Sequence, residues 1–233
     1  MKPNIVILTG AGISQESGIQ TFRDANGLWE NHDIMEVASP QGWQQNPGLV
    51  LEFYNQRRRQ LHDVQPNAAH EAITRLQKHF PVQVITQNVD DLHERAGNQN
   101  VLHLHGELFK VRSDQNPELI YDWHDDLHLG DLADDGAQLR PHIVWFGEPV
   151  PMITKAAELT AVADMFIIVG TGMAVYPAAG LVGYLPPFAP VYYIDPNPAP
   201  IAINNPVTII REKAGTELPK LVDRLIKEYI DFR

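Results

Sequence analysis

A glycine-rich segment near the start of the chain constrains the fold more than any other feature. Residues 10–24 read GAGISQESGIQTFRD and directly follow the apolar run at 5–8. An apolar run that ends in a glycine turn is typical of a buried parallel strand leading into a helix start. Such a turn presents backbone N–H groups to a pyrophosphate. The segment predicts a dinucleotide-binding loop, although Gln15 stands where the G-x-G-x-x-G pattern has its third glycine.

The remaining apolar runs indicate a single α/β unit. Strand-like runs lie at 5–8, 82–86, 143–146, 165–169 and 191–194, with helical patterns at 49–62, 67–79, 154–163 and 217–230. This alternation predicts a Rossmann-like parallel sheet with helices on both faces. Polar strings follow the runs that end at 8, 86, 169 and 194. We expect them to meet at the carboxyl edge of the sheet, where such folds bind ligands.

Composition narrows the function further. The formal net charge of −11 argues against nucleic-acid binding, which needs a basic face, and suits basic, lysine-bearing protein substrates. No apolar stretch reaches the roughly 18 residues of a membrane span. No signal peptide precedes the first strand, so we expect a cytoplasmic protein without a membrane partner. The absence of cysteine excludes disulfides and thiolate metal sites.

Two polar strings carry candidate chemistry. Gln87-Asn88-Val89-Asp90 follows the run at 82–86, and its amide and carboxylate groups can hydrogen-bond a ribose and a carboxamide. Considered alone, this string is more often a polar helix cap. Further on, His103 and His105 alternate with leucines. Histidine is the natural general base near neutral pH, although a lone histidine is more often structural.

Together these strings resemble the sirtuin family, the NAD-dependent protein-lysine deacylases. The resemblance runs from residue 4 to about 225, so it implies one catalytic domain over residues 1–233. It implies that NAD is a consumed co-substrate. It makes His105, in His105-Gly106-Glu107, the base that deprotonates a ribose hydroxyl, gives Asn88 a catalytic role at the ribose, and leaves His103 structural.

The resemblance also implies a set of NAD contacts on the glycine loops and the strings beside them. They are Gly10, Ala11, Gly12, Ile13, Thr21, Phe22, Arg23, Trp29, Gln87, Asn88, Val89, Asp90, Gly170, Thr171, Gly172, Asp195, Pro196, Asn197 and Ala214. Three positions depart from the family. Gly172 replaces a serine, Asp195 stands where asparagine is usual, and Asn197 stands where glutamate is common. These departures bear on NAD affinity more than on the reaction type.

Acyl-lysine protein substrates follow from the same resemblance. The segment at 143–146 reads as a simple buried strand, but in the family it pairs with the substrate backbone. The contacts implied are Val144, Phe146, Gly147 and Glu148.

A second pair of residues indicates which acyl group is removed. Tyr54 and Arg57 lie three apart on one predicted helical face, and arginine suits bidentate carboxylate binding. The alternative is a solvated surface arginine, as the adjacent Arg58 and Arg59 suggest. Tyr-x-x-Arg falls where desuccinylase-type (class III) sirtuins carry it, and Ala38 matches the small residue that admits a longer acyl chain. The resemblance thus implies removal of succinyl, malonyl and acetyl groups.

The chain departs from most sirtuins in its small module, which they hold together with zinc on four cysteines. Ser113 stands where a first cysteine is expected, so we expect no zinc and a module at about 107–141 held by packing. The candidate packing residues are Leu119, Ile120, Trp123, Leu127 and Leu132. A nitrogen–oxygen metal site at His124, Asp125 and His128 is the less favoured alternative. The other parts predicted are a Rossmann-like part at about 1–35, 80–106 and 142–233, and a helical insertion at about 36–79.

Two other functions remain open at this point. An ADP-ribosyltransferase or NAD hydrolase would share the dinucleotide loops but pass the reactive ribose to another acceptor or to water. A non-catalytic NAD-sensing module would need neither base nor substrate strand. The Tyr54/Arg57 pair and the segment at 144–148 argue against the first, and intact His105, Asn88 and Asp90 argue against the second. We also expect a monomer.

Overall fold

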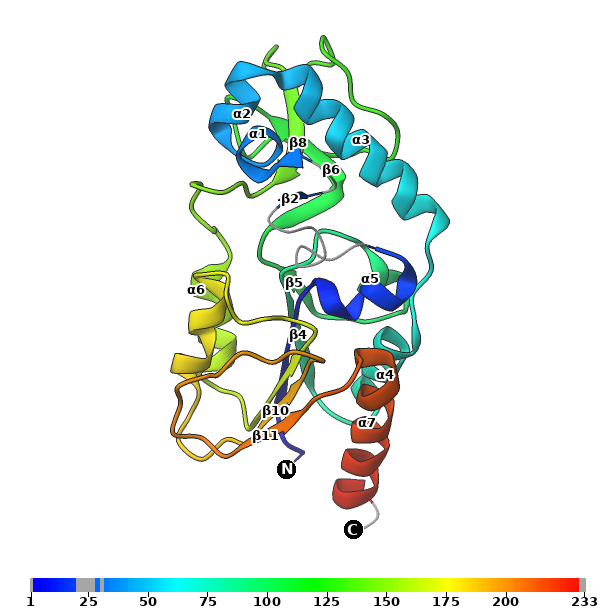
Figure 1. Ribbon diagram of the computed structural model, residues 1–233, viewed down its shortest axis with the longest axis vertical. Helices are drawn as coiled ribbons and strands as arrows, with labels where there is room; N and C mark the ends of the chain where they lie inside the picture. Colours follow the sequence, from blue (N-terminus) through cyan, green and yellow to red (C-terminus); the bar gives the residue numbers. More distant parts are fainter. Residues whose placement is uncertain (1, 20–27, 30–31, 231–233) are drawn as a thin grey trace.

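The computed structural model describes residues 2–19, 28–29 and 32–230. Within them, a parallel six-stranded sheet has the order β11-β10-β9-β1-β4-β5 (Figure 1). Its strands are β1 (Ile5–Thr9), β4 (Val82–Thr86), β5 (Val101–His103), β9 (Met165–Val169), β10 (Val191–Ile194) and β11 (Val207–Ile210). Read from β5, this is the 3-2-1-4-5-6 order of a doubly wound sheet. The predicted fold class is confirmed.

The large sheet is covered on both faces because its strands are apolar on both. One face, which includes Ile5 and Ile7 of β1, packs against α4 (Ala68–Gln77) and α7 (Ala214–Ile230). The other, which includes Val6 and Leu8, packs against α6 (Ile153–Thr160) and the 3-10 helix η3 (Ala178–Tyr184). Figure 1 shows the two helix layers on opposite sides of the sheet. The residues of α4 fall within the helical insertion predicted at about 36–79. In the structure, α4 instead packs against the large sheet beside α7.

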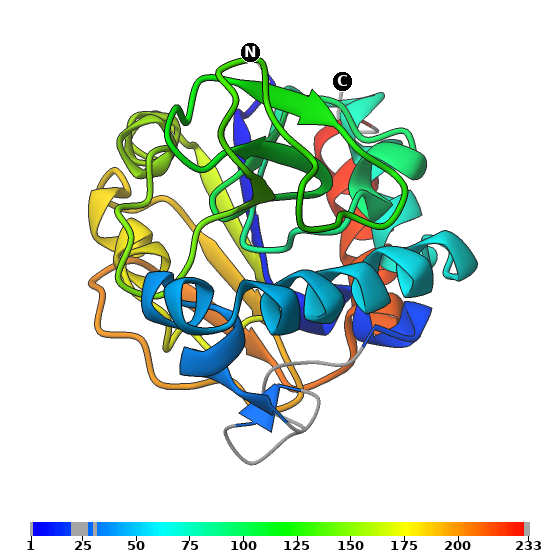
Figure 2. The ribbon, with the colours of Figure 1, turned by 90° about the horizontal axis from the view of Figure 1, so that it is seen from above.

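A second unit lies above the large sheet, and we call it the upper unit (Figures 1 and 2). It contains an antiparallel sheet in the order β7-β6-β8 and three helices. Its elements are α1 (Ile34–Val37), α2 (Pro40–Gln45), α3 (Pro47–Asp63), β6 (Gly106–Ser113), β7 (Ile120–Asp122) and β8 (Leu139–Ile143). Phe53 and Leu61 of α3 share one core with Leu108 and Val111 of β6. The helices α1–α3 of the predicted insertion therefore form one packed body with the predicted small module.

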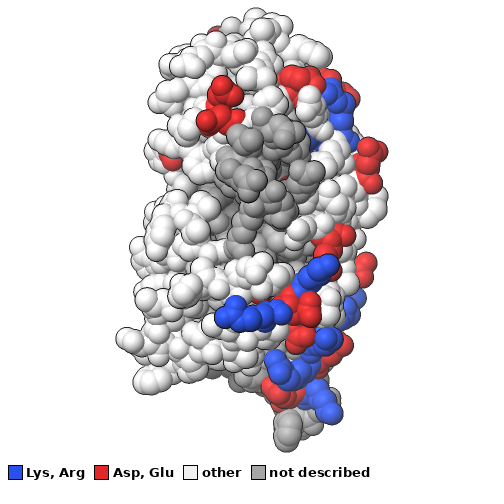
Figure 3. Space-filling view, viewed as in Figure 1, with Lys and Arg blue, Asp and Glu red and all other residues white. Residues whose placement is uncertain are grey.

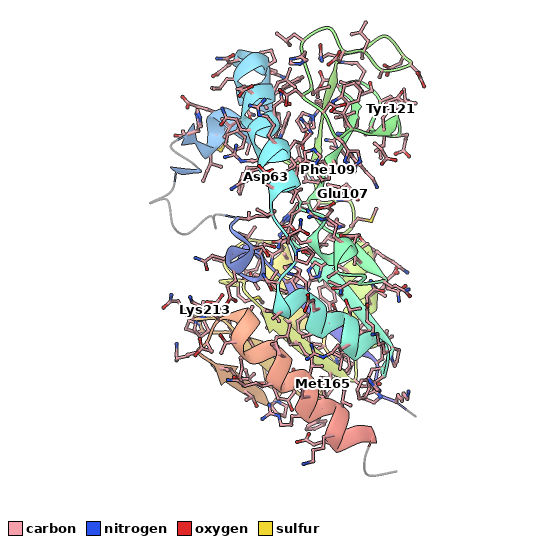
Figure 4. The ribbon with its side chains drawn as sticks, turned by 90° about the vertical axis from the view of Figure 1, so that its right-hand side faces the viewer. Asp63, Glu107, Phe109, Tyr121, Met165 and Lys213 are labelled. Atoms are coloured by element: carbon pink, nitrogen blue, oxygen red, sulfur yellow. The ribbon has the colours of Figure 1, made fainter. Side chains whose placement is uncertain are left out.

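Shorter elements complete the described part of the chain. They are η1 (Ala11–Ile13), η2 (Gln15–Ser17), the hairpin of β2 (Leu28–Trp29) and β3 (His32–Asp33), and α5 (Leu92–Arg95). In the side view of Figure 4, Met165 lies within the large sheet, and Phe109 and Tyr121 lie in the small sheet. The end of α3 contacts the small sheet, since the rings of His62 and Phe109 are 4.9 Å apart.

Two sequence-based expectations for the upper unit are wrong. A strand was predicted at 143–146 in the parallel sheet. In the structure, Ile143 is instead the last residue of β8, which belongs to the small antiparallel sheet. The prediction rested on the apolar character of 143–146, but the residues after Ile143 do not continue the strand. Val144 N donates to the His105 carbonyl, whereas Phe146 N donates to the Ala38 carbonyl. Of the predicted packing residues, Leu127 is fully buried, whereas Ile120 and Leu132 are 44% and 58% exposed. The space beneath the small sheet is filled by residues of α1–α3 instead.

Charge is distributed unevenly over the surface. Figure 3 shows charged side chains gathered along one side, over α3 and α7, and a largely uncharged face over α6. In the sequence, Asp195 is the single charged residue between Asp164 and Arg211, and it is 4% exposed. The segment from β9 to β11 therefore gives the molecule a nearly charge-free surface. In the described part of the chain, no helix has the length and apolar character to cross a membrane.

Candidate functional site

The candidate site lies at the carboxyl edge of the large sheet, between β1 and β9. Strand order reverses there, since the chain runs from β1 outward to β4 and later returns to β9 on the other side. Crevices at such switch points are the usual ligand sites of doubly wound sheets. The strings after β1, β4, β9 and β10 meet at this edge, as the sequence predicted.

The two glycine loops contact each other directly. The amide of Gly12 donates to the carbonyl of Gly170 at 2.8 Å, and a Cβ on Gly12 would lie 2.7 Å from the Gly170 Cα. Gly170 itself has a φ of +60°, which disfavours side chains. From the sequence, the glycines were expected to form a turn that presents backbone N–H groups to a pyrophosphate. The structure adds a second reason, which is the crossing of two backbones.

A buried polar chain follows the end of β4. The Asn88 amide donates to Ser14 Oγ at 3.1 Å, and Ser14 Oγ donates to Asp90 Oδ2 at 2.9 Å. Burial raises the pKa of Asp90 to about 6, although the Ser14 hydrogen bond lowers it in part. Gln87 Nε2 donates to Thr171 Oγ1 at 3.0 Å and so ties this string to the β9 loop. Sequence reasoning missed Ser14, whose one signal was its place inside the glycine loop.

His105 is held as a neutral base. Its Nδ1 lies 3.0 Å from the carbonyl oxygen of Gln87. A carbonyl only accepts, so the hydrogen bond assigns the proton to Nδ1 and leaves the Nε2 lone pair to take a proton. Burial lowers the pKa of His105, and the Gln87 hydrogen bond offsets this only in part. The imidazole is therefore unprotonated near neutral pH.

His103 differs from His105 in that both of its ring nitrogens are engaged. Nδ1 lies 2.9 Å from the Asn88 carbonyl oxygen, and Nε2 lies 3.0 Å from Glu94 Oε1. Burial lowers the pKa of His103, but the Glu94 carboxylate outweighs burial and the net pKa is raised. This geometry fits the structural role that the resemblance gives His103.

The predicted substrate segment runs between the two units. Val144 N donates to the His105 carbonyl and Phe146 N to the Ala38 carbonyl, both at 2.9 Å. Phe146 is 40% exposed, and Gly147 forms the turn with a φ of +92°. The segment therefore starts at the candidate base and passes the residue that the resemblance places at the acyl pocket.

Glu148, predicted as a substrate contact, is bound within the chain. Its carboxylate pairs with Arg140 Nη1 at 2.8 Å and Arg112 Nη2 at 3.4 Å, and accepts from Trp145 N at 2.8 Å. Burial raises the pKa of Glu148, but these donors outweigh it and hold the pKa below its usual range. The carboxylate thus fixes the turn at the end of the predicted substrate segment.

Tyr54 and Arg57 lie on a buried face of α3. Tyr54 is fully buried and Arg57 is 7% exposed, so the alternative of a solvated surface arginine is wrong. The Tyr54 hydroxyl accepts from Trp145 Nε1 at 3.0 Å. Arg57 Nη1 donates to the Phe53 carbonyl, and the guanidinium carbon lies 3.2 Å from the centre of the Phe53 ring. Burial raises the pKa of Tyr54, so the phenol is a neutral donor and acceptor.

The remaining predicted NAD contacts are spread around the same edge. Asp195 directly follows β10, and its carboxylate accepts from Asn197 N at 2.8 Å. Ala214 begins α7, where Gly215 N donates to Glu16 Oε2 at 2.7 Å. The residues Thr21, Phe22 and Arg23 lie outside the described part of the chain, as does the side chain of Trp29.

Most sirtuins, by the resemblance, carry a first zinc-binding cysteine at the position of Ser113. In this chain the Ser113 hydroxyl holds the turn with hydrogen bonds. Ser113 Oγ donates to Asp135 Oδ2 at 2.7 Å and accepts from Gln115 N and Asn116 N, each at 3.1 Å. Among the residues that the structure describes, no three His, Asp or Glu side chains are arranged to hold a metal ion. The alternative site at His124, Asp125 and His128 is therefore not formed.

Comparisons with known proteins agree with this geometry. The sequence matches the Sir2 family over residues 10–177. It is 58% identical over 224 residues to an NAD-dependent protein deacylase of Helicobacter pylori, covering 96% of each chain. It is 50% identical over 229 residues to an NAD-dependent protein deacylase of Bacteroides thetaiotaomicron, covering 96% of this chain and 98% of the relative.

Solved structures give the same result. A Sir2 homologue in complex with NAD has a TM-score of 0.84 and 36% identity, covering 97% of this chain and 91% of its own. A Sir2 protein bound to acetylated peptide has a TM-score of 0.77 and 26% identity, covering 97% and 93%. The chain therefore belongs to the Sir2 family, and the predicted sirtuin resemblance is confirmed.

Proposed function

We propose that this chain is an NAD-dependent protein-lysine deacylase that removes succinyl and malonyl groups as well as acetyl groups. The products would be the unmodified lysine, nicotinamide and O-acyl-ADP-ribose. Family membership and the relatives named as NAD-dependent protein deacylases support the NAD-dependent deacylase activity. The buried Tyr54/Arg57 pair is the observation that supports the acidic acyl groups.

The residues at the sheet edge fit NAD chemically. The two crossing glycine loops would offer backbone groups to the pyrophosphate of NAD. Asn88 and Asp90 offer an amide and a carboxyl group for the carboxamide and ribose, and Asp195 offers a carboxylate at the end of β10. Bound NAD would supply a ribose carbon from which nicotinamide can depart.

His105 performs the proton transfer in this proposal. The acyl oxygen of the modified lysine forms a bond to the ribose carbon. At the same time the bond from that carbon to nicotinamide breaks, and nicotinamide leaves with the electron pair. His105 Nε2 then accepts a proton from a ribose hydroxyl, which lets that oxygen attack the acyl carbon. The Gln87 carbonyl stabilises the imidazolium through the Nδ1 hydrogen bond. Water finally releases the lysine amine and leaves the acyl group on ADP-ribose.

The Arg57 guanidinium and the Tyr54 hydroxyl would bind the distal carboxylate of a succinyl or malonyl group. Hydrogen bonds to charged groups contribute about 1.5–3 kcal/mol, and acetyl-lysine has no carboxylate to make them. We therefore expect kcat/KM to favour succinyl-lysine over acetyl-lysine by about 10- to 150-fold in matched peptides.

The test compares Arg57→Met with Arg59→Met in the same helix. Arg59 is half exposed and pairs with Glu52, so its substitution changes surface charge without touching the buried pair. We expect Arg57→Met to lose most of the succinyl preference while Arg59→Met keeps it. Equal losses of both activities in Arg57→Met would refute the acyl-pocket assignment.

A further inference from the structure

Trp145 lies in the middle of the predicted substrate segment, but its side chain is buried in the core of the upper unit. Its neighbours Val144 and Phe146 present backbone amides to the carbonyls of His105 and Ala38. The Trp145 side chain is 2% exposed and packs in the upper-unit core beside Trp43, with ring centres 5.8 Å apart. The sequence pattern alone did not distinguish Trp145 from an aromatic residue that only fills the core.

The indole of Trp145 donates to the Tyr54 hydroxyl at 3.0 Å. An indole N–H can only donate, so the Tyr54 oxygen accepts and directs its own proton away from Trp145. A hydroxyl that accepts one hydrogen bond donates a stronger one, because such chains polarise cooperatively. Tyr54 also stays protonated, since burial raises its pKa.

Trp145 is itself fixed from two sides. The Arg140 guanidinium carbon lies 3.3 Å from the centre of the Trp145 ring. Arg140 pairs with Glu148 at 2.8 Å, and the same Glu148 carboxylate accepts from the Trp145 backbone amide at 2.8 Å. A side chain locked in this way aims its hydrogen bond with little rotational freedom. The chain from Glu148 to Tyr54 thus ends at the proposed acyl pocket.

We propose that Trp145 is a positioning residue for acyl-group selection, whose indole N–H sets the Tyr54 hydroxyl to donate to a carboxylate bound by Arg57. The inference rests on the proposed removal of succinyl and malonyl groups. It makes selectivity depend on an N–H that never touches the substrate. Acetyl-lysine has no distal carboxylate, so its turnover depends less on this hydrogen bond.

The test measures kcat/KM for matched succinyl- and acetyl-lysine peptides. Trp145→Phe keeps an aromatic ring but removes the N–H, and we expect succinyl turnover to fall about tenfold more than acetyl turnover, a difference of about 1.4 kcal/mol. In a Tyr54→Phe background the same change should leave the ratio unaltered, because the hydroxyl it acts on is gone. Trp43→Phe, which removes the neighbouring indole, is the matched control and should keep the wild-type ratio.

Each result has a distinct meaning. If Trp145→Phe lowers both activities equally, or still shifts the ratio in the Tyr54→Phe background, Trp145 acts through packing and the inference is wrong. If the wild type prefers succinyl-lysine and Arg57→Met abolishes that preference while Trp145→Phe retains it, this inference alone fails. If the wild type does not desuccinylate, the proposed acyl specificity fails as well.

A spectroscopic readout covers the case in which Trp145→Phe does not fold. In ¹H–¹⁵N NMR spectra without NAD, an indole resonance identified as Trp145 by its response to Tyr54→Phe should shift when succinyl-lysine peptide binds. It should shift much less with acetyl-lysine peptide. Equal shifts with both peptides would overturn the inference.

Discussion

The two units of this molecule are stabilised in different ways. The large sheet is built from strands such as β1, whose five residues are all buried, with helices on both faces. The upper unit instead places a charge in its core. Arg58 of α3 is fully buried and donates to the Leu108 carbonyl at 3.0 Å and to Asn55 Oδ1 at 2.6 Å. Asn55 in turn exchanges two hydrogen bonds with the Leu127 backbone, at 3.0 and 2.9 Å.

This difference explains how a family member without cysteine can keep its small module. Buried polar groups that are hydrogen-bonded fix a specific geometry. Here Asn55 of α3 exchanges two hydrogen bonds with the loop between β7 and β8, which contains no cysteine to bind a metal. The large sheet carries the candidate chemistry on its edge, and the upper unit carries the proposed acyl selection. Substitutions should therefore separate catalysis, stability and selectivity.

The largest expected effect is on catalysis. His105→Ala removes the proposed base and should lower kcat/KM by about 10²- to 10⁴-fold with little change in melting temperature. His103→Gln is the matched control, because both its ring nitrogens have structural partners, and it should cost stability more than turnover. Similar losses of activity in the two variants would remove the distinction between these histidines.

The next effect tests the buried charge of the upper unit. Arg58→Met removes the Arg58 donor to the Leu108 carbonyl and one of two donors to Asn55 Oδ1, so we expect the free energy of unfolding to fall by about 2–3 kcal/mol. The exposed neighbour gives the control, since Arg59→Met removes a solvent-screened charge and should change the free energy of unfolding far less. Urea denaturation measures both. Equal small effects would mean that the buried guanidinium contributes no net stability.

The large-sheet side should respond to acid through buried neutral histidines. Burial lowers the pKa of His70 to about 3, and its ring lies 4.9 Å from that of His93, whose pKa burial lowers to about 4. Below the unfolded pKa of about 6.5, only the unfolded chain binds these protons, so stability falls with falling pH. His70→Gln should flatten this slope by about 1.4 kcal/mol per pH unit between pH 6.5 and 4. An unchanged slope would contradict the assignment.

A smaller effect is expected at the turn that replaces the zinc site. Ser113→Ala removes the acceptor for the Gln115 and Asn116 amides and the donor to Asp135. We expect a loss of about 1 kcal/mol in the free energy of unfolding. Thermal denaturation of the variant beside wild type measures it. A loss above about 3 kcal/mol would give this turn a larger role than we assign.

Removal of metal ions from the wild-type protein should have no measurable effect. If packing and hydrogen bonds hold the upper unit, EDTA should leave the melting temperature and the turnover of the wild-type protein unchanged. Structural zinc, by contrast, supplies folding free energy outright. A drop in melting temperature that added Zn²⁺ reverses would show a metal site made without cysteine.

The sequence predicted the large sheet well because its central strands are buried on both faces. The runs at 82–86, 165–169 and 191–194 coincide with β4, β9 and β10. It missed β11, an edge strand that follows Pro206 and leaves Ile209 46% exposed, because a half-exposed four-residue run gives little periodic signal.

The upper unit was harder to predict because its order depends on contacts that are distant in sequence. Arg58 looks like one of three consecutive surface arginines until Leu108 and Asn55 lie beside it. The inward turn of Trp145 depends in the same way on Tyr54, which is 91 residues away. Motif strings placed the residues of the candidate site, whereas the supporting hydrogen bonds required the structure.

The most direct test of the account is mass spectrometry of matched succinyl- and acetyl-lysine peptides incubated with NAD and either wild type or His105→Ala. We predict that the wild type removes both acyl groups, the succinyl group faster, with one O-acyl-ADP-ribose formed per nicotinamide, and that the variant removes both at least about 100-fold more slowly. NAD cleavage without deacylation would instead indicate a transferase or hydrolase. Intact NAD and intact peptides would indicate a binding module and contradict the proposed deacylase activity.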